Sequence, residues 1–552
     1  MPTGSTATQF DQSFADFLLG QVSSFQQTSI DAGALIHGHL YEGYFQDDFH
    51  ASSNLTLNGG VRYTFIQQPT AARMGNYPFI PLTNFDPSFY NPANTPTIGT
   101  NGLICTKAPC PGGGTPNPSY NPLNGIIIGG KTSPFGSAVN SQPVLTFAPR
   151  VGFAWDVRGN GTMALRGGYG IYYAQTRLGN YQPLANNNAP NVSNTTITNT
   201  SFDKPGNGIP VASSAPLVLQ GTSPNFSIPY TQDWSLDLQQ QIARNTVLDI
   251  GYYGNRSVHQ IGIEDLNQPF PGEYVQKGII PGDGVTTANS TLLNRIRPYS
   301  GYSSIDFIAP IFFSDYNSLQ ASLTKQFSDG NLLNLDYTWS KAMTDNQSDF
   351  SNAPQNIYNL AAEYGPAAFN KTNIFSANFV YVLPFLRTEQ GIAGHALGGW
   401  ETTGIISYTS GGFFTSRTIN VDPGGVGLLA AGTAPPSPRP DAVSNPNTGA
   451  PHNLHQWFNT AAFTQVPAGQ YRPGNAPVGD IVGPGSEIWN LSLFKNFQIA
   501  NSAVMQFRAE SFNTFNHTNF TGIATTLAQT NYGQVTAAGS ARVLQLALKI
   551  HF

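Results

Sequence analysis

Apolar and polar residues alternate along the end of the chain. The final run, SARVLQLALKIHF, places Leu544, Leu546, Leu548, Ile550 and Phe552 on one face and mostly polar residues on the other. A period of two predicts a β-strand with one apolar face. In a soluble sandwich that face would pack on a second sheet, whereas in a membrane barrel it would face lipid and the polar face would line a wet lumen. A last strand that ends on an aromatic residue favours an outer-membrane barrel, and we interpret Phe552 as a C-terminal assembly signal.

The same alternation recurs along the chain and predicts about 13 strands. Short connections, such as Ser328-Asp329-Gly330 with its Asp-Gly hairpin signal, alternate with long connections rich in Gly, Pro and Asn. Outer-membrane barrels have short periplasmic turns and long extracellular loops, so this order predicts an all-β fold, an antiparallel up-and-down transmembrane β-barrel with long extracellular loops. The predicted strands are residues 40–49, 54–65, 147–157, 161–173, 230–242, 245–254, 315–327, 332–342, 372–385, 400–411, 487–497, a strand that begins at Ala503 and turns from its predecessor through Ala500-Asn501, and the final strand.

Composition points in the same direction. Charged residues make up 10% of the 552 residues, against roughly 25% in soluble domains. The mean hydropathy is nevertheless slightly negative, because uncharged polar residues and Gly separate the apolar ones. Aromatic residues make up 12%, which suits two interfacial girdles. No apolar run approaches the length of about 18 residues that predicts a transmembrane helix, and the net charge of −5 gives no reason to propose nucleic acid as a partner.

The order of the connections also predicts an orientation. The last strand would run toward the periplasm, whereas the first strand, near Leu40, would begin on the extracellular side. Bacterial single-chain barrels have an even number of strands and start in the periplasm, so we expect further strands before Met1. The segment MPTGSTATQFDQSFADFLLG has no basic region followed by an apolar core, so we expect any signal peptide to precede it as well. Residues 1–36 are predicted to be a loop with a short helical lead-in, and residues 37–552 to be the C-terminal part of a barrel.

Several segments carry a family resemblance and follow one another over nearly all of residues 14–552. They are FADFLLG (14–20), YFQDDF (44–49), LTLNGGVRY (55–63), FAPRVGFAWDVRGNGTMALRGGYGIYY (147–173), PYTQDWSLDLQQQIARNTVLDIGYYGNRSVH (229–259), YNSLQASLTKQF (316–327), YTWSKAM (337–343) and FRAESFNTFNHTNF (507–520). Together they resemble the C-terminal part of Oar-like TonB-dependent receptors, which are large outer-membrane proteins.

This resemblance implies a barrel of about 22 strands with a plug inside it, of which the chain would supply the C-terminal part. It implies a receptor that binds a substrate and moves it across the bacterial outer membrane, by import or export. The implied partners are outer-membrane lipid, the barrel assembly machinery, the TonB system reached through an N-terminal part, and an unidentified substrate. The alternative is an outer-membrane adhesion or structural barrel whose loops bind a ligand without transport, and which needs neither plug nor TonB box. Because an open sheet leaves unpaired edges in lipid, we expect these strands alone not to insert stably.

The predicted inward faces carry charged residues. Arg62, Arg150 and Arg166 fall on three successive strands, and acidic residues fall on the later ones. One interpretation is a lumen with separate basic and acidic walls that steers a charged solute; the favoured one is that these residues pair with each other or with a plug, since inward charges need solvent or a partner. The predicted acidic lumen residues are Asp233, Asp237, Asp249 and Asp336. The residues predicted to form outward interfacial belts, or in a sandwich a packed core, are Trp155, Trp234, Trp339, Trp400, Trp489, Tyr63, Tyr169 and Tyr337.

Few residues suggest chemistry. Cys105 and Cys110 in CTKAPC are predicted to form a disulfide in an oxidising compartment, with two free thiols as the alternative. His452 and His455 have a metal-like spacing, but no general-base pattern or third ligand accompanies them, so two loop histidines are favoured. The sequence therefore predicts no enzyme, no cofactor and no metal site.

Overall fold

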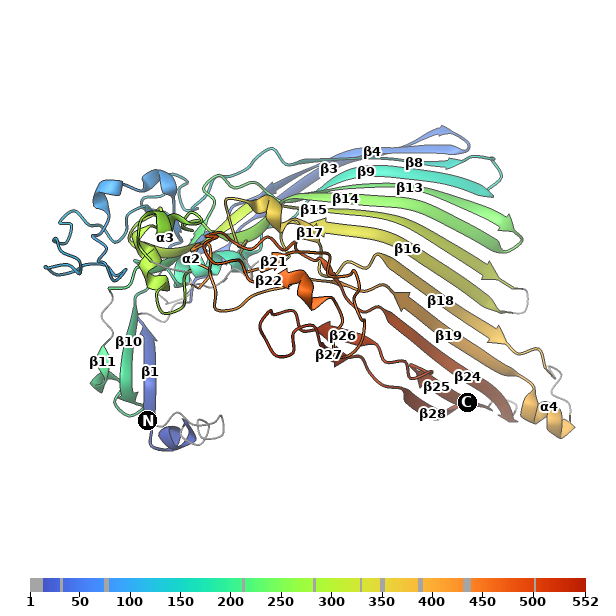
Figure 1. Ribbon diagram of the computed structural model, residues 1–552. Coiled ribbons are helices and arrows are strands. Elements are labelled where there is room, and N and C mark those ends of the chain that lie inside the picture. The colour runs from blue at the N-terminus through green and yellow to red at the C-terminus, as the bar shows by residue number, and fades with distance from the viewer. Residues whose placement is uncertain are drawn as a thin grey trace.

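A curved antiparallel sheet dominates the computed structural model (Figure 1). The model describes residues 13–29, 33–73, 79–210, 214–280, 284–327, 330–347, 353–385, 391–429, 438–500 and 503–552. Thirteen strands pair with their neighbours in chain order, from the edge strand β3 to the edge strand β28. They are β3 (Leu40–Ser52), β4 (Leu55–Ile66), β8 (Phe147–Asp156), β9 (Met163–Tyr173), β13 (Tyr230–Ala243), β14 (Thr246–Asp265), β15 (Tyr302–Gln326), β16 (Leu332–Thr344), β18 (Asn373–Val382), β19 (Trp400–Thr409), β24 (Ser486–Ala500), β25 (Ala503–Phe512) and β28 (Val543–His551).

This sheet confirms the predicted all-β, antiparallel up-and-down fold. Most strand bounds agree with the alternation pattern to within a few residues, but two strands are longer than predicted. β14 continues to Asp265 and β15 begins at Tyr302, where the sequence SIDFIAPIFF is almost continuously apolar. The prediction missed the β15 extension because both of its faces are buried, which removes the period of two. The β14 extension pairs with it and mixes exposed, half-buried and buried residues. The turn residues Ser328, Asp329 and Asn501 lie outside the described residues.

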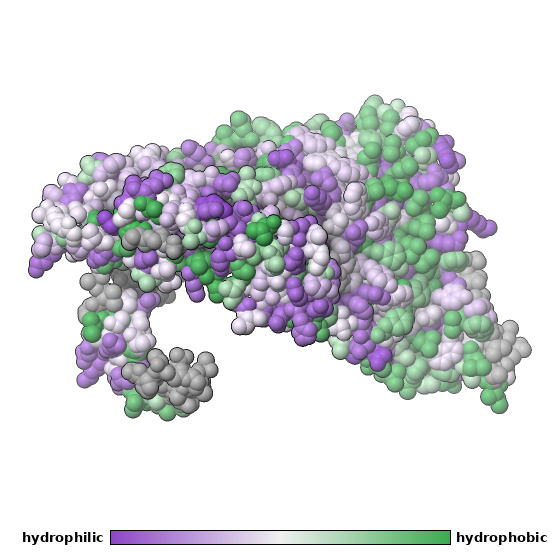
Figure 2. All heavy atoms as spheres, in the orientation of Figure 1, coloured by the Kyte–Doolittle hydropathy of each residue, from purple (hydrophilic) through white to green (hydrophobic). Residues whose placement is uncertain are grey.

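The two faces of the sheet differ in chemistry. Strand partners share a face, so the registers place Leu57, Phe153 and Leu236 together on the apolar side. Large apolar side chains on this side are exposed, for example Leu236 at 50% and Leu546 at 73%. Figure 2 shows apolar residues gathered over the strands and hydrophilic residues over the connecting segments. The apolar face is therefore suited to lipid rather than to a second protein layer.

The long connections gather at one end of the sheet and form a folded layer (Figure 1). We call it the loop layer: the described residues of 67–146, 174–229, 266–301, 345–372, 410–485 and 513–542, with the ends of β14 and β15 that enter it. Its strands are β5 (Thr70–Ala72), β6 (Thr83–Phe85), β7 (Ile126–Ile128), β10 (Asn194–Ser201), β11 (Ile209–Pro210), β12 (Leu217–Thr222), β17 (Gly365–Pro366), β20 (Phe413–Phe414), β21 (Asp441–Ala442), β22 (Phe463–Thr464), β23 (Ile481–Val482), β26 (Phe520–Ile523) and β27 (Val535–Ala538). Of these, β10 pairs with β1 (Gln21–Thr28), and β5 pairs with β2 (Leu35–His37).

Short helices complete the structure. Within the part of the chain that the structure describes, no helix has the length and apolar content needed to cross a bilayer. The α-helices are α2 (Gln182–Asn186), α3 (Glu273–Gln276) and α4 (Gly391–Leu397), and the 3-10 helices are η1 (Pro87–Phe89), η2 (Pro92–Asn94), η3 (Leu178–Tyr181), η4 (Pro205–Asn207), η5 (Ser290–Arg295), η6 (Leu360–Glu363) and η7 (Thr460–Ala462).

The N-terminal segment differs from its prediction. Residues 13–18 are helical, in line with the expected helical turn, but residues 21–28 form β1 instead of a loop and pair antiparallel with β10. The sequence TTIT in β10 favours an extended backbone, and β10 lies more than a hundred residues further along the chain. The pattern of residues 1–36 alone could not reveal a partner at that separation.

Candidate functional site

The polar side of the sheet forms a groove of about 780 Å³. We call this side the concave face. The strand registers align Gly60, Arg150, Gly170 and Asp233 in one row across four strands. Glycines at two places in this row leave the backbone uncovered, and a Cβ at Gly60 would lie 2.8 Å from the Phe45 carbonyl oxygen. The residues whose side chains border the groove on this face include Tyr44, Arg62, Arg150, Tyr172, Asp233, Tyr253, Asn255 and Tyr316.

The predicted lumen residues all lie on this face, but their partners vary. Arg166 is 3.7 Å from Asp237 and also donates to the Gln239 amide oxygen at 3.0 Å. Arg62 faces Glu42 at 3.6 Å, a partner on β3 that the sequence interpretation did not include. Such open pairs contribute little free energy, since solvent screens them. Among the described residues, Arg166 and Asp237 are therefore the one pair in which a predicted lumen arginine meets a predicted lumen acid, and their contact joins β9 to β13.

The other predicted residues interact without an ion pair among the described residues. The Arg150 guanidinium carbon lies 4.4 Å from the centre of the Tyr172 ring. Asp336 accepts a hydrogen bond from the Ser322 hydroxyl at 2.7 Å. Asp249 and Asp336 border a second hollow of about 300 Å³. Of the predicted residues, the arginines lie on β4, β8 and β9 and the acids on β13, β14 and β16, but Glu42 on β3 adds a negative charge on the side of the arginines.

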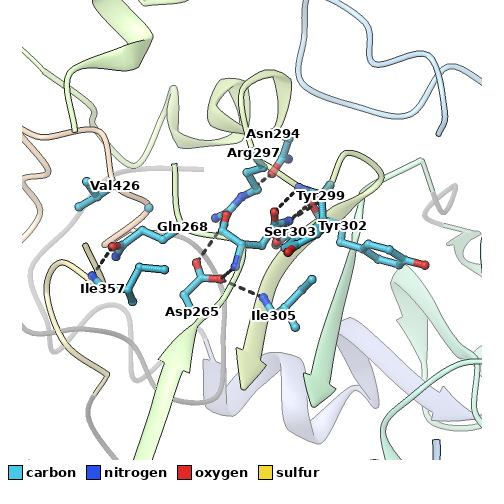
Figure 3. A network of polar contacts seen from close by, with 12 residues as sticks. Asp265, Gln268, Asn294, Arg297, Tyr299, Tyr302, Ser303, Ile305, Ile357 and Val426 are labelled. Carbon is cyan, nitrogen blue, oxygen red and sulfur yellow. Dashed lines mark hydrogen bonds and ion pairs between the residues drawn. The ribbon is translucent and has the colours of Figure 1, made fainter. Parts of the chain in front are cut away.

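A buried polar network joins segments of the loop layer where β14 and β15 enter it (Figure 3). The Arg297 guanidinium donates to the Asp265 carboxylate at 2.9 Å, and both side chains are almost fully buried. The second Asp265 oxygen accepts the backbone N–H of Ile305 at 3.0 Å. Asn267, which is completely buried, donates to the Ser303 carbonyl at 2.7 Å. These contacts join the two ends of the β14–β15 connection, where the alternation pattern gave no signal.

The other residues predicted from the sequence are the two cysteines, the loop histidines, Phe552 and the aromatic belt residues. Cys105 and Cys110 form a disulfide. His452 packs against Trp457 with ring centres 5.1 Å apart, and no group of three or more potential metal ligands occurs in the described residues. Phe552 follows β28 and is 97% exposed. The belt residues lie on the apolar face, with Trp155 and Trp400 near the short turns and the others toward the loop layer: Tyr63, Tyr169, Trp234, Tyr337, Trp339 and Trp489.

The fold and the two chemically distinct faces define a class of protein, the outer-membrane β-barrels. The outer membrane beta barrel domain family matches residues 2–545, and the chain belongs to this family. Its place is therefore the bacterial outer membrane. No curated protein matches the chain.

Solved outer-membrane transporters are similar in structure and distant in sequence. The transporter YddB from Escherichia coli is 10% identical, with 94% of this chain and 54% of that chain covered and a TM-score of 0.41. The ferric-catecholate import receptor Fiu from E. coli K12 is 9% identical, with 94% and 45% covered and a TM-score of 0.40. The FrpB iron transporter from Neisseria meningitidis is 8% identical, with 99% and 49% covered and a TM-score of 0.41. The chain spans about half the length of these proteins.

Proposed function

We propose that this chain forms part of the β-barrel of a TonB-dependent receptor of the Oar-like kind, and that this receptor moves a substrate across the outer membrane. The observation that carries the proposal is the concave face, where a groove of about 780 Å³ is bordered by Arg62, Arg150 and Asp233 and lies on the side of the sheet opposite the apolar face. A barrel that serves only adhesion also has a polar interior, so the two functions differ in whether a solute crosses the membrane.

In this proposal each part of the chain has one role. The loop layer captures the substrate, and the concave face conducts it past Arg150, Arg166 and Asp237. A plug and the TonB system, supplied from outside this sequence, gate and energise the passage. Lipid contacts the apolar face, and the barrel assembly machinery recognises Phe552. The proposal assigns no catalysis and no cofactor to the chain.

The experiment replaces the inner charges while leaving the loops intact. Arg150→Gln and Arg166→Gln are introduced together in the natural gene, and solutes taken from the medium are compared by mass spectrometry with those taken by wild-type cells and by cells lacking the gene. We expect the double variant to reach the surface normally and to lose the solute uptake that the deletion also loses. Arg244→Gln, in the short turn between β13 and β14, is the matched control and should take up solute as the wild type does.

Two results would contradict the proposal. One is unchanged uptake in the double variant. The other is a deletion strain that takes up every solute normally but no longer attaches to surfaces, which is the result expected of an adhesin.

A further inference from the structure

A cavity of about 640 Å³ lies where the loop layer meets the ends of β19 and β24. Its floor includes Thr409 and Ser486, whose hydroxyl oxygens are 2.8 Å apart at the loop end of the concave face. Its walls come from β20, from β26 and from the segment before β18. Cavities of about 300–1,000 Å³ are the usual size for small-molecule sites. The cavity thus lies between the outside and the proposed conducting face.

Two cations line this cavity and no acid does. They are Lys371 and Arg417, and neither forms an ion pair with any residue that the structure describes. The Lys371 ammonium lies beside Gly412, where a Cβ would come within 3.2 Å of its Nζ atom. The Arg417 backbone is held on both sides, because its N–H donates to the Thr525 carbonyl at 2.9 Å and its carbonyl accepts the Leu527 N–H at 2.7 Å.

The neighbouring acids form no ion pair with these cations among the described residues. Glu363 and Asp345 line a small hollow that Arg417 also borders, and Glu363 is bound by Arg439, with an N–O distance of 2.6 Å. Arg439 in turn repels Arg417, and burial together with this repulsion lowers the Arg417 pKa. Burial also lowers the Lys371 pKa. A partly buried cation without a counter-charge is costly, so an anion that enters the cavity would regain part of that cost.

The rest of the lining fits a ring. Phe413, Phe414 and Phe520 supply aromatic surface, and Thr415 and Thr521 supply hydroxyl groups near it. Aromatic side chains prefer offset-stacked or edge-to-face contact with other rings. Phe414 also packs on the cluster around Phe458 and Phe520 contacts Trp457, so each of these two rings is held in place. A small inorganic anion would satisfy the two cations without contacting the aromatic surface.

We propose that this cavity binds an organic anion that combines a carboxylate or phosphate group with a planar ring. The inference rests on the proposed receptor function, because it names the substrate class that the loop layer would capture. Lys371 and Arg417 hold the charged group, and the phenylalanines hold the ring.

The test compares two ligands that differ in charge alone. Naphthalene-2-carboxylate and naphthalene-2-carboxamide are titrated into the detergent-purified protein at low salt, and binding is measured by calorimetry. We expect the carboxylate to bind at least tenfold more tightly than the carboxamide. In the double variant Lys371→Met, Arg417→Gln this preference should disappear, whereas the matched control Lys341→Met, Arg244→Gln should keep it. Naphthyl phosphate, titrated in parallel, shows which charged group the cations prefer.

Equal affinity for the two ligands, or an unchanged preference in the double variant, would overturn the inference. The single variant Lys371→Arg changes the side chain but keeps both positive charges, and it should keep at least part of the preference for the carboxylate. It therefore separates the effect of the charge from a change in the fold. The outcome is independent of the uptake experiment. A protein that prefers the carboxylate but transports no solute would leave the cavity assigned and reject the transporter, and the reverse result would reject only the cavity.

Discussion

The sheet and the loop layer handle apolar side chains in opposite ways. All five buried apolar clusters of the described residues lie in the loop layer, for example the cluster around Leu82, Ile127 and Tyr181 and the cluster around Phe458 and Ile481. In the sheet, leucines such as Leu236 and Leu546 are instead exposed. The loop layer is built like a water-soluble domain with its own cores, whereas the sheet leaves its apolar side for lipid.

The difference shows that one chain is folded for two solvents. In lipid the backbone must be satisfied by neighbouring strands, so an unbroken ladder of antiparallel pairs is required. In water the loop layer gains stability from apolar burial and from paired buried polar groups such as Asp265 and Arg297. Changes in one region should therefore have consequences that the other region does not share.

The largest effect is expected at the Asp265–Arg297 pair. Arg297→Ala would leave the buried Asp265 carboxylate without its cation, and breaking a buried pair in this way costs about 3–5 kcal/mol. We expect residues 266–301 to become sensitive to protease and to exchange amide hydrogens quickly, while the sheet keeps its thermal transition in detergent. The measurement is hydrogen exchange read by mass spectrometry.

The matched control is the Arg166–Asp237 pair on the concave face. Arg166 is 46% exposed there and lies 3.7 Å from Asp237, so Arg166→Ala should cost only about 0–1 kcal/mol. A comparable loss of protection in both variants would contradict the view that the loop layer has its own core.

The second prediction concerns adjacent residues of β13 that lie on opposite faces. Leu236→Arg places a charge on the apolar face near the middle of the strand and should cost about 2–4 kcal/mol of folding free energy in vesicles. Ser235→Arg places the same charge on the concave face, between Asp233 and Asp237 of the same strand, and should cost much less. Refolding of the natural gene product from urea into lipid vesicles measures both, and equal costs would show that the apolar face does not contact lipid.

This contrast also explains what the sequence could predict. The sheet was predictable strand by strand, because lipid on one side and water on the other impose a period of two. The contact between Arg166 and Asp237 could be proposed for the same reason, since both follow from face assignment. The parallel pairing of β12 with β15 could not be predicted, because Pro310 argues against a strand and the partner segments are far apart in sequence. The cavity at Lys371 and Arg417 likewise combines three separate loops.

A third prediction tests whether the loop layer is a set of local units. The disulfide between Cys105 and Cys110 closes a loop with a sequence separation of 5. Closing so short a loop removes about 2 kcal/mol of unfolded-chain entropy in the chain-entropy model. Replacing both cysteines by Ala should raise protease sensitivity around residues 99–114 and leave the Asp265–Arg297 network protected. Loss of protection in both places would show a single cooperative layer instead.

The smallest effect is expected from pH, and it concerns the loop layer. The Asp480 carboxyl accepts no hydrogen bond from any described residue, and burial raises its pKa to about 7. In the unfolded chain the pKa of an aspartate is about 4, so the folded form holds an extra proton between about pH 4 and pH 7. The contribution of this group to stability is therefore complete at the acidic end of that range and is lost as the pH rises through the folded pKa.

Asp480→Asn imitates the neutral carboxyl at every pH. We expect it to stabilise the loop layer at pH 8 by on the order of 1 kcal/mol, reduced from the full shift because the group is only partly buried. It should reduce, without abolishing, the loss of protease resistance between pH 5 and pH 8, since burial also raises the pKa of Asp345 to about 6 and that of Glu264 to about 7. Asp441→Asn is the opposite case, because the hydrogen bond from Arg472 lowers the Asp441 pKa and the carboxylate is already charged at pH 5. That variant should be less stable at both pH values, with its pH slope unchanged. If Asp480→Asn keeps the wild-type slope, the acid that senses pH lies elsewhere in the loop layer.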